Sequence, residues 1–276
     1  MTDHRRLQRT LFRMQHDADF AARLRAEDAD AVASTGLAPG ELAWLRAADP
    51  RALAADREGR RSQQLLESVT SEFALTTHPA VARTLAPSWP RGFAASPEFH
   101  AAVSGGTSLP LAFGVFAARR AREAGSVGLA ALAALEGELA RARRLPGCSA
   151  APAPGCVVRS PEVSLLVLPQ GSFALATALR TALDAGAAPA PSALRGLHPE
   201  ASECVMVHAL GPARAHRLRE ARAERLEPLV ADLLRAAQEP LDAAARRRFA
   251  AQHGLDAAEV EAVVSDFAGE AVLVAG

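Results

Sequence analysis

The 276-residue sequence contains neither lysine nor tyrosine. All 31 basic residues are therefore arginine, and 31 acidic residues balance them to a formal charge of zero. A neutral chain has no overall field to draw it onto nucleic acid, although a local arginine face would still bind phosphates. The charge balance argues against a general nucleic-acid-binding protein, and we interpret the exclusive use of arginine as a coding bias.

Long apolar runs and cysteines are also scarce. No segment reaches the roughly 18 apolar residues of a membrane span, and the N-terminus lacks the apolar stretch of a signal peptide. We therefore expect a cytoplasmic protein that does not enter a membrane. Cys148, Cys156 and Cys204 are too few for a disulfide framework, so reduced thiols are expected, with a redox-sensitive pair of Cys148 and Cys156 as the alternative.

Known catalytic and metal-binding motifs are missing from the sequence. It has no phosphate loop, nucleophile elbow, zincin helix, paired-cysteine metal site or EF-hand loop. Ser104–Ser108 could wrap an anion, but no strand precedes it and no lysine follows, so we expect a turn between helices. The histidines stand singly, and His78 and His100 are the leading candidates among them. An enzyme whose site joins distant histidines stays an alternative.

Helix signals fill the first half of the chain. The Asp49-Pro50 pair is typical of a helix start, and apolar residues from Leu53 to Phe73 predict a long amphipathic helix that ends near His78-Pro79. Further helices are expected to begin at Ser96 and to run from about Ser126 to Arg144. Because residues 146–155 have the composition of a linker, we predict a helical domain over residues 1–145.

Residues 156–276 are predicted to form a mixed α/β domain. Cys156–Val158 and Val163–Leu168 are typical of strands, and a helix is expected from Ser172 to Leu183. Cys204–His208 and Ala213–Leu218 would pair as a hairpin. The helix after it would bury one face made of Leu226, Leu229, Val230, Leu233 and Leu234.

The last forty residues carry the clearest local signals. Asp242 can cap a helix that stops at Gly254, and Asp256 with Glu259 forms a capping box for the next helix. A closing strand is expected at Ala271–Val274. Helix, short helix, helix and strand is the order of a winged-helix-like module. The predicted fold class is therefore α+β, with an N-terminal helical bundle followed by a small mixed α/β domain that ends in a winged-helix-like module.

Such a module would bind either DNA or a peptide. The presumed recognition helix, Ala257–Phe267, carries three acidic residues and no arginine, so phosphates would repel it, and Arg246–Arg248 on the preceding helix is the remaining DNA candidate. A peptide could instead add a strand to the hairpin edge, at Val205–Ala209 or Arg214–Leu218, unless the hairpin is simply paired and packed. The candidate peptide-binding residues are Val205, Val207, Ala209, Arg214, His216, Leu218, Leu226 and Val230.

Several stretches, taken in order, resemble a known family. They are Arg60–Leu66 leading to Phe73 and His78–Val81, then Phe99–Phe116, Leu132–Glu136, Val163–Pro169 and the terminal winged-helix-like run. The chain resembles the partner proteins, often described as carrying a DNA-binding domain, that accompany multinuclear non-heme iron-dependent oxidative enzymes in gene clusters for ribosomally made, modified peptides. The usual tryptophan after Glu136 is missing, and Gly137 stands there. The segment Phe20–Leu53 is also similar to the small helical domain found beside extradiol dioxygenases.

This resemblance implies a non-catalytic subunit without a cofactor of its own. It would bind the iron enzyme through one face and present a precursor peptide for oxidation, so the iron would belong to the partner. Residues 1–145 would dock the enzyme, and residues 156–276 would recognise the peptide around Val205–Leu234. A transcriptional regulator that uses the C-terminal module on DNA is the alternative.

Overall fold

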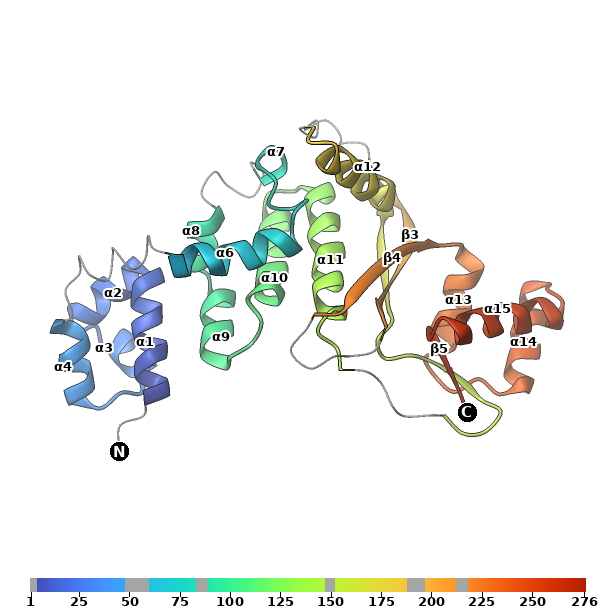
Figure 1. The fold of residues 1–276 in the computed structure, drawn as a ribbon, viewed down its shortest axis with the longest axis horizontal. Coiled ribbons are helices and arrows are strands. Elements are labelled where there is room, and N and C mark those ends of the chain that lie inside the picture. Colours follow the sequence, from blue (N-terminus) through green and yellow to red (C-terminus); the bar gives the residue numbers. More distant parts are fainter. Residues whose placement is uncertain (1–3, 48–59, 83–88, 147–151, 188–196, 212–217) are drawn as a thin grey trace. The chain divides into compact units, whose positions relative to one another are not determined.

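A computed structural model describes residues 4–47, 60–82, 89–146, 152–187, 197–211 and 218–276 (Figure 1). The chain divides into two compact units, Met1–Ser126 and Val127–Gly276. The fold is mixed α and β, predominantly helical with small antiparallel sheets, which confirms the α+β class. None of the helices in the described ranges is both long and apolar enough to cross a membrane.

The first unit is helical throughout its described part. Its elements are α1 (His4–His16), α2 (Ala18–Arg25), α3 (Ala29–Thr35), α4 (Pro39–Ala47), α6 (Arg60–Glu72), α7 (Pro79–Ala82), α8 (Trp89–Ala94), α9 (Pro97–Gly105) and α10 (Leu109–Glu123).

The helices α1–α4 share a small core of their own. Met14, Phe20, Leu24 and Leu45 are almost fully buried in it. Short side chains set the helix starts, because Asp17 accepts a hydrogen bond from the N–H of Phe20, at 2.8 Å, and so caps α2. The sequence around Asp17 therefore breaks one long helical run into two helices that pack on each other.

Aromatic rings form the core of α6–α10. The ring of Phe113 lies 5.0 Å from those of Phe73 and Trp89 and 5.2 Å from that of Phe93, measured between centroids and in edge-on geometry. Such edge-to-face pairs add to the free energy gained from burial alone. This cluster holds the helices together because its rings come from the residue just after α6, from α8 and from α10.

The expected long helix is shorter than predicted. Helix α6 ends at Glu72, and the chain then turns, with the N–H of Thr77 donating to the carbonyl of Phe73 at 2.8 Å. The β-branched Thr76 and Thr77 and the residue before Pro79 disfavour helical geometry, which accounts for the early stop. The expected start at Asp49-Pro50 lies outside the described residues.

Other predicted boundaries are confirmed. The hydroxyl of Ser96 accepts from the N–H of Phe99 at 3.2 Å and caps α9, and Gly106 adopts a left-handed conformation with φ 67° just after that helix. Ser104–Ser108 is thus the turn between α9 and α10, as expected.

The second unit combines helices with two small sheets. Its elements are α11 (Val127–Ala142), β1 (Val157–Arg159), β2 (Ser164–Gln170), α12 (Ser172–Asp184), β3 (His198–Leu210), β4 (Glu220–Leu226), α13 (Pro228–Ala236), α14 (Ala243–His253), α15 (Ala257–Gly269) and β5 (Leu273–Ala275).

The boundary between the units differs from the prediction. We expected it in the proline-rich segment 146–155, but it falls after Ser126, so α11 belongs with the sheet. The hydroxyl of Ser164 on β2 donates to Glu138 of α11 at 2.8 Å, and Arg141 also bonds to Ser164. Composition misled the prediction because a loop rich in proline and glycine can lie inside a unit as well as between units.

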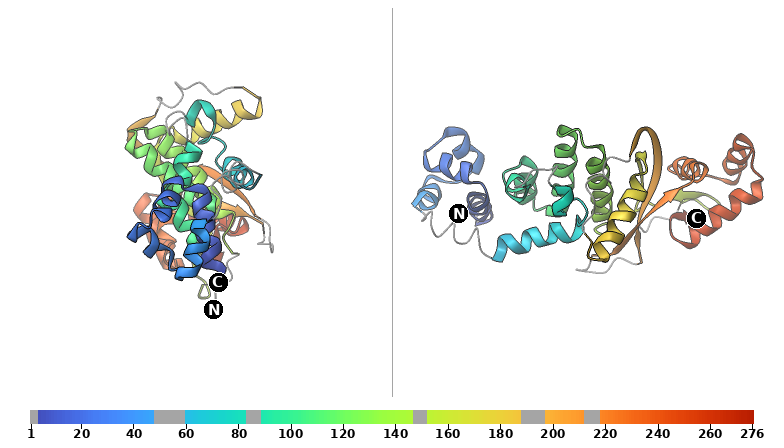
Figure 2. Two further views of the ribbon diagram at one scale, coloured as in Figure 1. Left: turned by 90° about the vertical axis from the view of Figure 1, so that its left-hand side faces the viewer. Right: turned by 90° about the horizontal axis from the view of Figure 1, so that it is seen from above.

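Strands β2, β3 and β4 form an antiparallel sheet in that order. Helix α11 lies against one face, whereas Met206 and Leu165 on the other face pack with Leu233 and Leu234 of α13 (Figures 1 and 2). The sheet is therefore buried between helices on both faces over much of its area.

The predicted position of the second hairpin strand, Ala213–Leu218, is wrong. β3 pairs with β4, at Glu220–Leu226, and residues 213–217 of the strand that we expected lie outside the described residues. Glu220–Leu226 is rich in arginine, glutamate and alanine, which favour helix, but pairing with the apolar part of β3 overrides that propensity. Leu226 consequently ends a strand, and α13 begins only at Pro228, a favoured first-turn residue.

The C-terminal helices follow the predicted order. Asp256 and Glu259 make the reciprocal bonds of a capping box, and Leu255 and Val260 belong to one apolar cluster. Strand β5 pairs with β1, and Val157 on the far side of β1 bridges Leu241 between α13 and α14. These pairings tie the first strand of the second unit to its last strand.

Candidate functional site

The first of the two predicted peptide-binding edges, Val205–Ala209, lies in β3. Val205 and Val207 lie in β3, which pairs with β2 on one side and β4 on the other, and both side chains are 0% exposed. Val205–Val207 is therefore not an edge, and a peptide cannot add a strand there, whereas among the described strands His208 and Ala209 pair with β4 alone. The prediction failed because it treated β3 as half of a hairpin and overlooked its pairing with β2.

The remaining predicted residues are scattered. Leu226 and Val230 are partly buried against the core of α13–α15, and Leu218 is exposed just before β4. Arg214 and His216 lie outside the described residues. The structure therefore does not bring the predicted set together as one surface.

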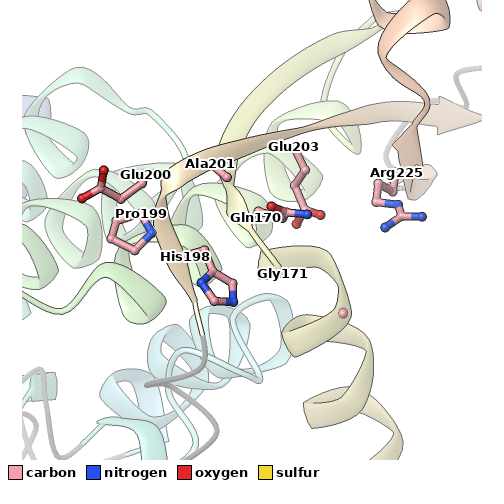
Figure 3. A pocket seen from close by; sticks show the side chains of 9 residues that line it. Gln170, Gly171, His198, Pro199, Glu200, Ala201, Glu203 and Arg225 are labelled. Atoms are coloured by element: carbon pink, nitrogen blue, oxygen red, sulfur yellow. The ribbon is translucent and has the colours of Figure 1, made fainter.

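An open pocket lies where β3 extends beyond its neighbour. β4 ends at Leu226, opposite Cys204, whereas β3 begins six residues before that cysteine, at His198. The pocket has a volume of about 660 Å³ (Figure 3). Its lining comes from β3 at His198–Ala201 and Glu203, from the end of β2 at Gln170 and Gly171, from α12 at Ala174 and from β4 at Arg225.

A bulge shapes the floor of this pocket. Pro169 pairs with Ser202, but the next residue, Gln170, pairs with His198, so Pro199–Ala201 is left out of the ladder. Bulges of this kind re-aim side chains and interrupt pairing. Pro199 fits such a position because it has no N–H to contribute. Within the described part of the sheet, this stretch of β3 has no strand on its β4 side either.

The charges of the pocket have different roles. Glu203 accepts a hydrogen bond from the N–H of Phe173 at 2.7 Å, so its carboxylate serves the first turn of α12. Arg225 is exposed on the rim across from Glu203 (Figure 3), and no ion pair forms to it among the described residues. Its neighbour Arg222 instead pairs with Glu224 at 2.9 Å. The guanidinium of Arg225 is thus the cationic group that the pocket offers to a ligand.

Sequence reasoning missed these residues although one signal was present. From Glu220 to Glu224, charged residues alternate with alanine, which is the period of a strand with one covered face. That pattern identifies β4 and hence Arg225. The bulge at Pro199–Ala201 has no comparable local signal, because it depends on the register between β2 and β3.

The C-terminal arginines are not all available to a ligand. Arg246 pairs with Glu261 of α15 at 2.7 Å and donates to the carbonyl of Leu241 at 2.9 Å, and its side chain is only 12% exposed. Arg247 and Arg248 are both exposed on the same helix. Helix α15 carries Glu259, Glu261 and Asp266 without a basic residue, so this surface lacks a cationic reading helix.

The histidines highlighted by the sequence do not form a metal site in the described ranges. His100 lies 3.0 Å from a carboxylate oxygen of Asp17, and burial and the nearby Arg13 lower its pKa. His78 is half-buried before α7. No group of three or more histidine, cysteine, aspartate or glutamate side chains in the described residues is placed to hold a metal ion.

The redox-sensitive pair of Cys148 and Cys156 stays a prediction. Cys148 lies outside the described residues, and Cys156 and Cys204 are free thiols. Burial raises the pKa of Cys204, with opposing contributions from Arg235 and Arg159, so this thiol is held in its neutral form.

No protein-family model matches the chain, and no curated protein matches it either.

Proposed function

We propose that the protein is a non-catalytic partner subunit that binds a multinuclear non-heme iron enzyme and recruits a ribosomally made precursor peptide for oxidation. The observation that supports this role best is the interrupted sheet of the second unit. Exposed strand backbone beside a pocket suits an extended peptide, which satisfies backbone donors and acceptors as a further strand would. In this proposal the iron belongs to the partner.

The charges of the last three helices favour a peptide over DNA. A winged-helix-like arrangement of α13–α15 and β5 would present α15 as its recognition helix, and that helix is acidic. Arg246, the first of the three arginines before it, is engaged by Glu261. Binding DNA here would place carboxylates against phosphates and would require Arg246 to leave its partners.

The first unit offers a surface for the enzyme. Trp44 on α4 is 57% exposed, and its exposed neighbours Ala43 and Ala47 carry no charge. The charged side chains of α4 are occupied within the unit, because Glu41 accepts from the N–H of Ala38 and Arg46 pairs with Glu27. A tryptophan on an uncharged surface is typical of protein-binding sites.

Co-expression tests both parts of the proposal. The chain should retain the iron enzyme encoded beside it through affinity purification, and it should bind the leader peptide of the precursor in the same gene cluster. Retention of the enzyme should fall with Trp44→Ser and persist with the control Val115→Ser, since Val115 is a similarly exposed apolar residue, on α10. Binding to promoter DNA, without binding to enzyme or peptide, would contradict the proposal and favour a regulator.

A further inference from the structure

The pocket at the start of β3 gives the proposed peptide interaction a specific location. Three features of the described residues coincide there: strand backbone without a partner strand, a hollow lined in part by small residues, and an arginine without an ion pair. The inference rests on the proposed function.

Backbone groups are the first feature. Pro199–Ala201 is out of register with β2, and β4 stops at Leu226 before it can reach Ser202 and Glu203. Strand N–H and C=O groups that lack a partner favour a further extended segment. Among the described residues, no strand continues the line of β4 along this part of β3, and the pocket lies there.

Room for a side chain is the second feature. Gly171, Ala174 and Ala201 have small or no side chains and line the pocket from the end of β2, from α12 and from β3. The volume of about 660 Å³ lies within the range of sites that hold a small ligand or a few peptide residues. A segment that follows the gap would direct alternate side chains into this hollow.

Charge is the third feature, and it selects the occupant. Glu203 is already used by the N–H of Phe173, while Arg225 stands exposed on the rim without an ion pair in the described part of the chain. A carboxylate on the ligand would pair with this guanidinium in two parallel hydrogen bonds. The chemistry therefore fits an acidic residue within an extended peptide.

We propose that the pocket formed by β3, the start of α12 and Arg225 binds a short extended segment of the precursor peptide, which lies in line with β4 and pairs an acidic side chain with Arg225. The occupant is thus located at the start of β3, and the predicted Val205–Ala209 stretch has no part in it. A second copy of the chain is the competing occupant, and the two differ in whether filling the pocket affects peptide binding or dimer formation.

Filling the pocket tests its location. Ala174 is an exposed pocket residue on α12, and Ala178 is exposed one turn further along the same helix, outside the pocket lining. The probe is a fluorescein-labelled synthetic leader peptide from the neighbouring precursor gene, titrated with the full chain. Ala174→Trp should weaken binding at least about tenfold, whereas the control Ala178→Trp should stay within about twofold.

The charge partner is tested with the same probe. Arg225→Glu should weaken binding about tenfold, and replacing the responsible acidic residue of the peptide with lysine should restore much of the affinity to this variant and reduce it for the unchanged chain. Hydrogen exchange should slow at His198–Glu203 on peptide binding. If both tryptophan variants bind like the unchanged chain, or if exchange slows only at Glu220–Leu226, the location is wrong although recruitment stands.

Other results would overturn more than the location. If the unchanged chain binds no leader peptide and retains no iron enzyme, the proposed function fails. If the chain forms dimers that Ala174→Trp dissociates while peptide binding is unaffected, the occupant is a second copy and the inference is overturned.

Discussion

His100 is half-buried in the first unit between opposite charges. Asp17 lies 3.0 Å from its Nε2 atom and also caps α2, and Arg13 stacks over the ring of Phe20 close by. Burial, followed by Arg13, lowers the pKa of His100 below its ordinary value of 6.5, and Asp17 acts in the opposite direction. The neutral imidazole is therefore the form that the folded protein favours.

This environment predicts a loss of stability in acid. Because the pKa of His100 is lowered in the folded state, its contribution to stability is fully present above about pH 6.5 and is lost as the pH falls through the folded-state pKa. The free energy of unfolding, measured with urea at pH 7.5 and pH 5.5, should decrease in acid. The decrease should be smaller in His100→Gln. An equal decrease in both proteins would show that His100 does not contribute.

Arg246 on α14 is held by two partners within the second unit. Its bonds to Glu261 and to the carbonyl of Leu241 make it a structural residue. Arg246→Met should lower the free energy of unfolding by about 1–2 kcal/mol, because two charge-assisted interactions are lost from a largely buried side chain. Arg248→Met, on the exposed side of α14, should change it by less than about 0.5 kcal/mol. Equal melting temperatures for the two variants would contradict this role.

Among the elements of the second unit, β3 places a continuous buried stretch, Cys204–His208, between its two neighbouring strands and the helices. Met206 is fully buried and packs with the core of α13–α15, whereas Val167 on β2 is 64% exposed. Met206→Ala should cost about 2–5 kcal/mol through the cavity that it leaves, and Val167→Ala should cost less than about 0.5 kcal/mol. Chemical denaturation of both variants tests the assignment, and a small effect at Met206 would show that β3 is not central to the fold.

The elements also show which features the sequence could predict. The caps at Ser96, Asp242 and Asp256 depend on side chains within three residues of the bonds that they make, so local pattern was sufficient. β4 was missed because its composition favours helix. The pocket could not be predicted, because it depends on where β4 stops relative to β3 and on a bulge set by the register with β2.

In the whole molecule, α11 belongs to the second unit, so the chain divides just before this helix. It contributes Glu138 and Arg141 to Ser164 on β2, and Arg143 just after it accepts from the N–H of Arg219 at 3.1 Å, so the sheet depends on it. A fragment of residues 127–276 should unfold cooperatively on heating. A fragment of residues 146–276 would expose the face of the sheet that holds Val205 and Val207, so it should aggregate or bind a hydrophobic dye. Cooperative unfolding of the shorter fragment would support the boundary that we first expected.

The proposed division of labour is a property of the whole molecule. The first unit exposes Trp44 beside residues without charge. The second unit has an interrupted sheet with a pocket that Arg225 lines. A chain of this kind would supply binding energy to a reaction while its partner supplies the iron. Such a role predicts that the protein changes the rate of the partner's reaction without any activity of its own.

The most direct measurement is the rate of precursor oxidation by the iron enzyme, followed by mass spectrometry, with and without this protein. The account predicts modified peptide only when the iron enzyme is present, and a rate that rises at least about tenfold when this protein is added, because recruitment raises the effective concentration of substrate. An iron enzyme that modifies the precursor equally fast alone would contradict the account.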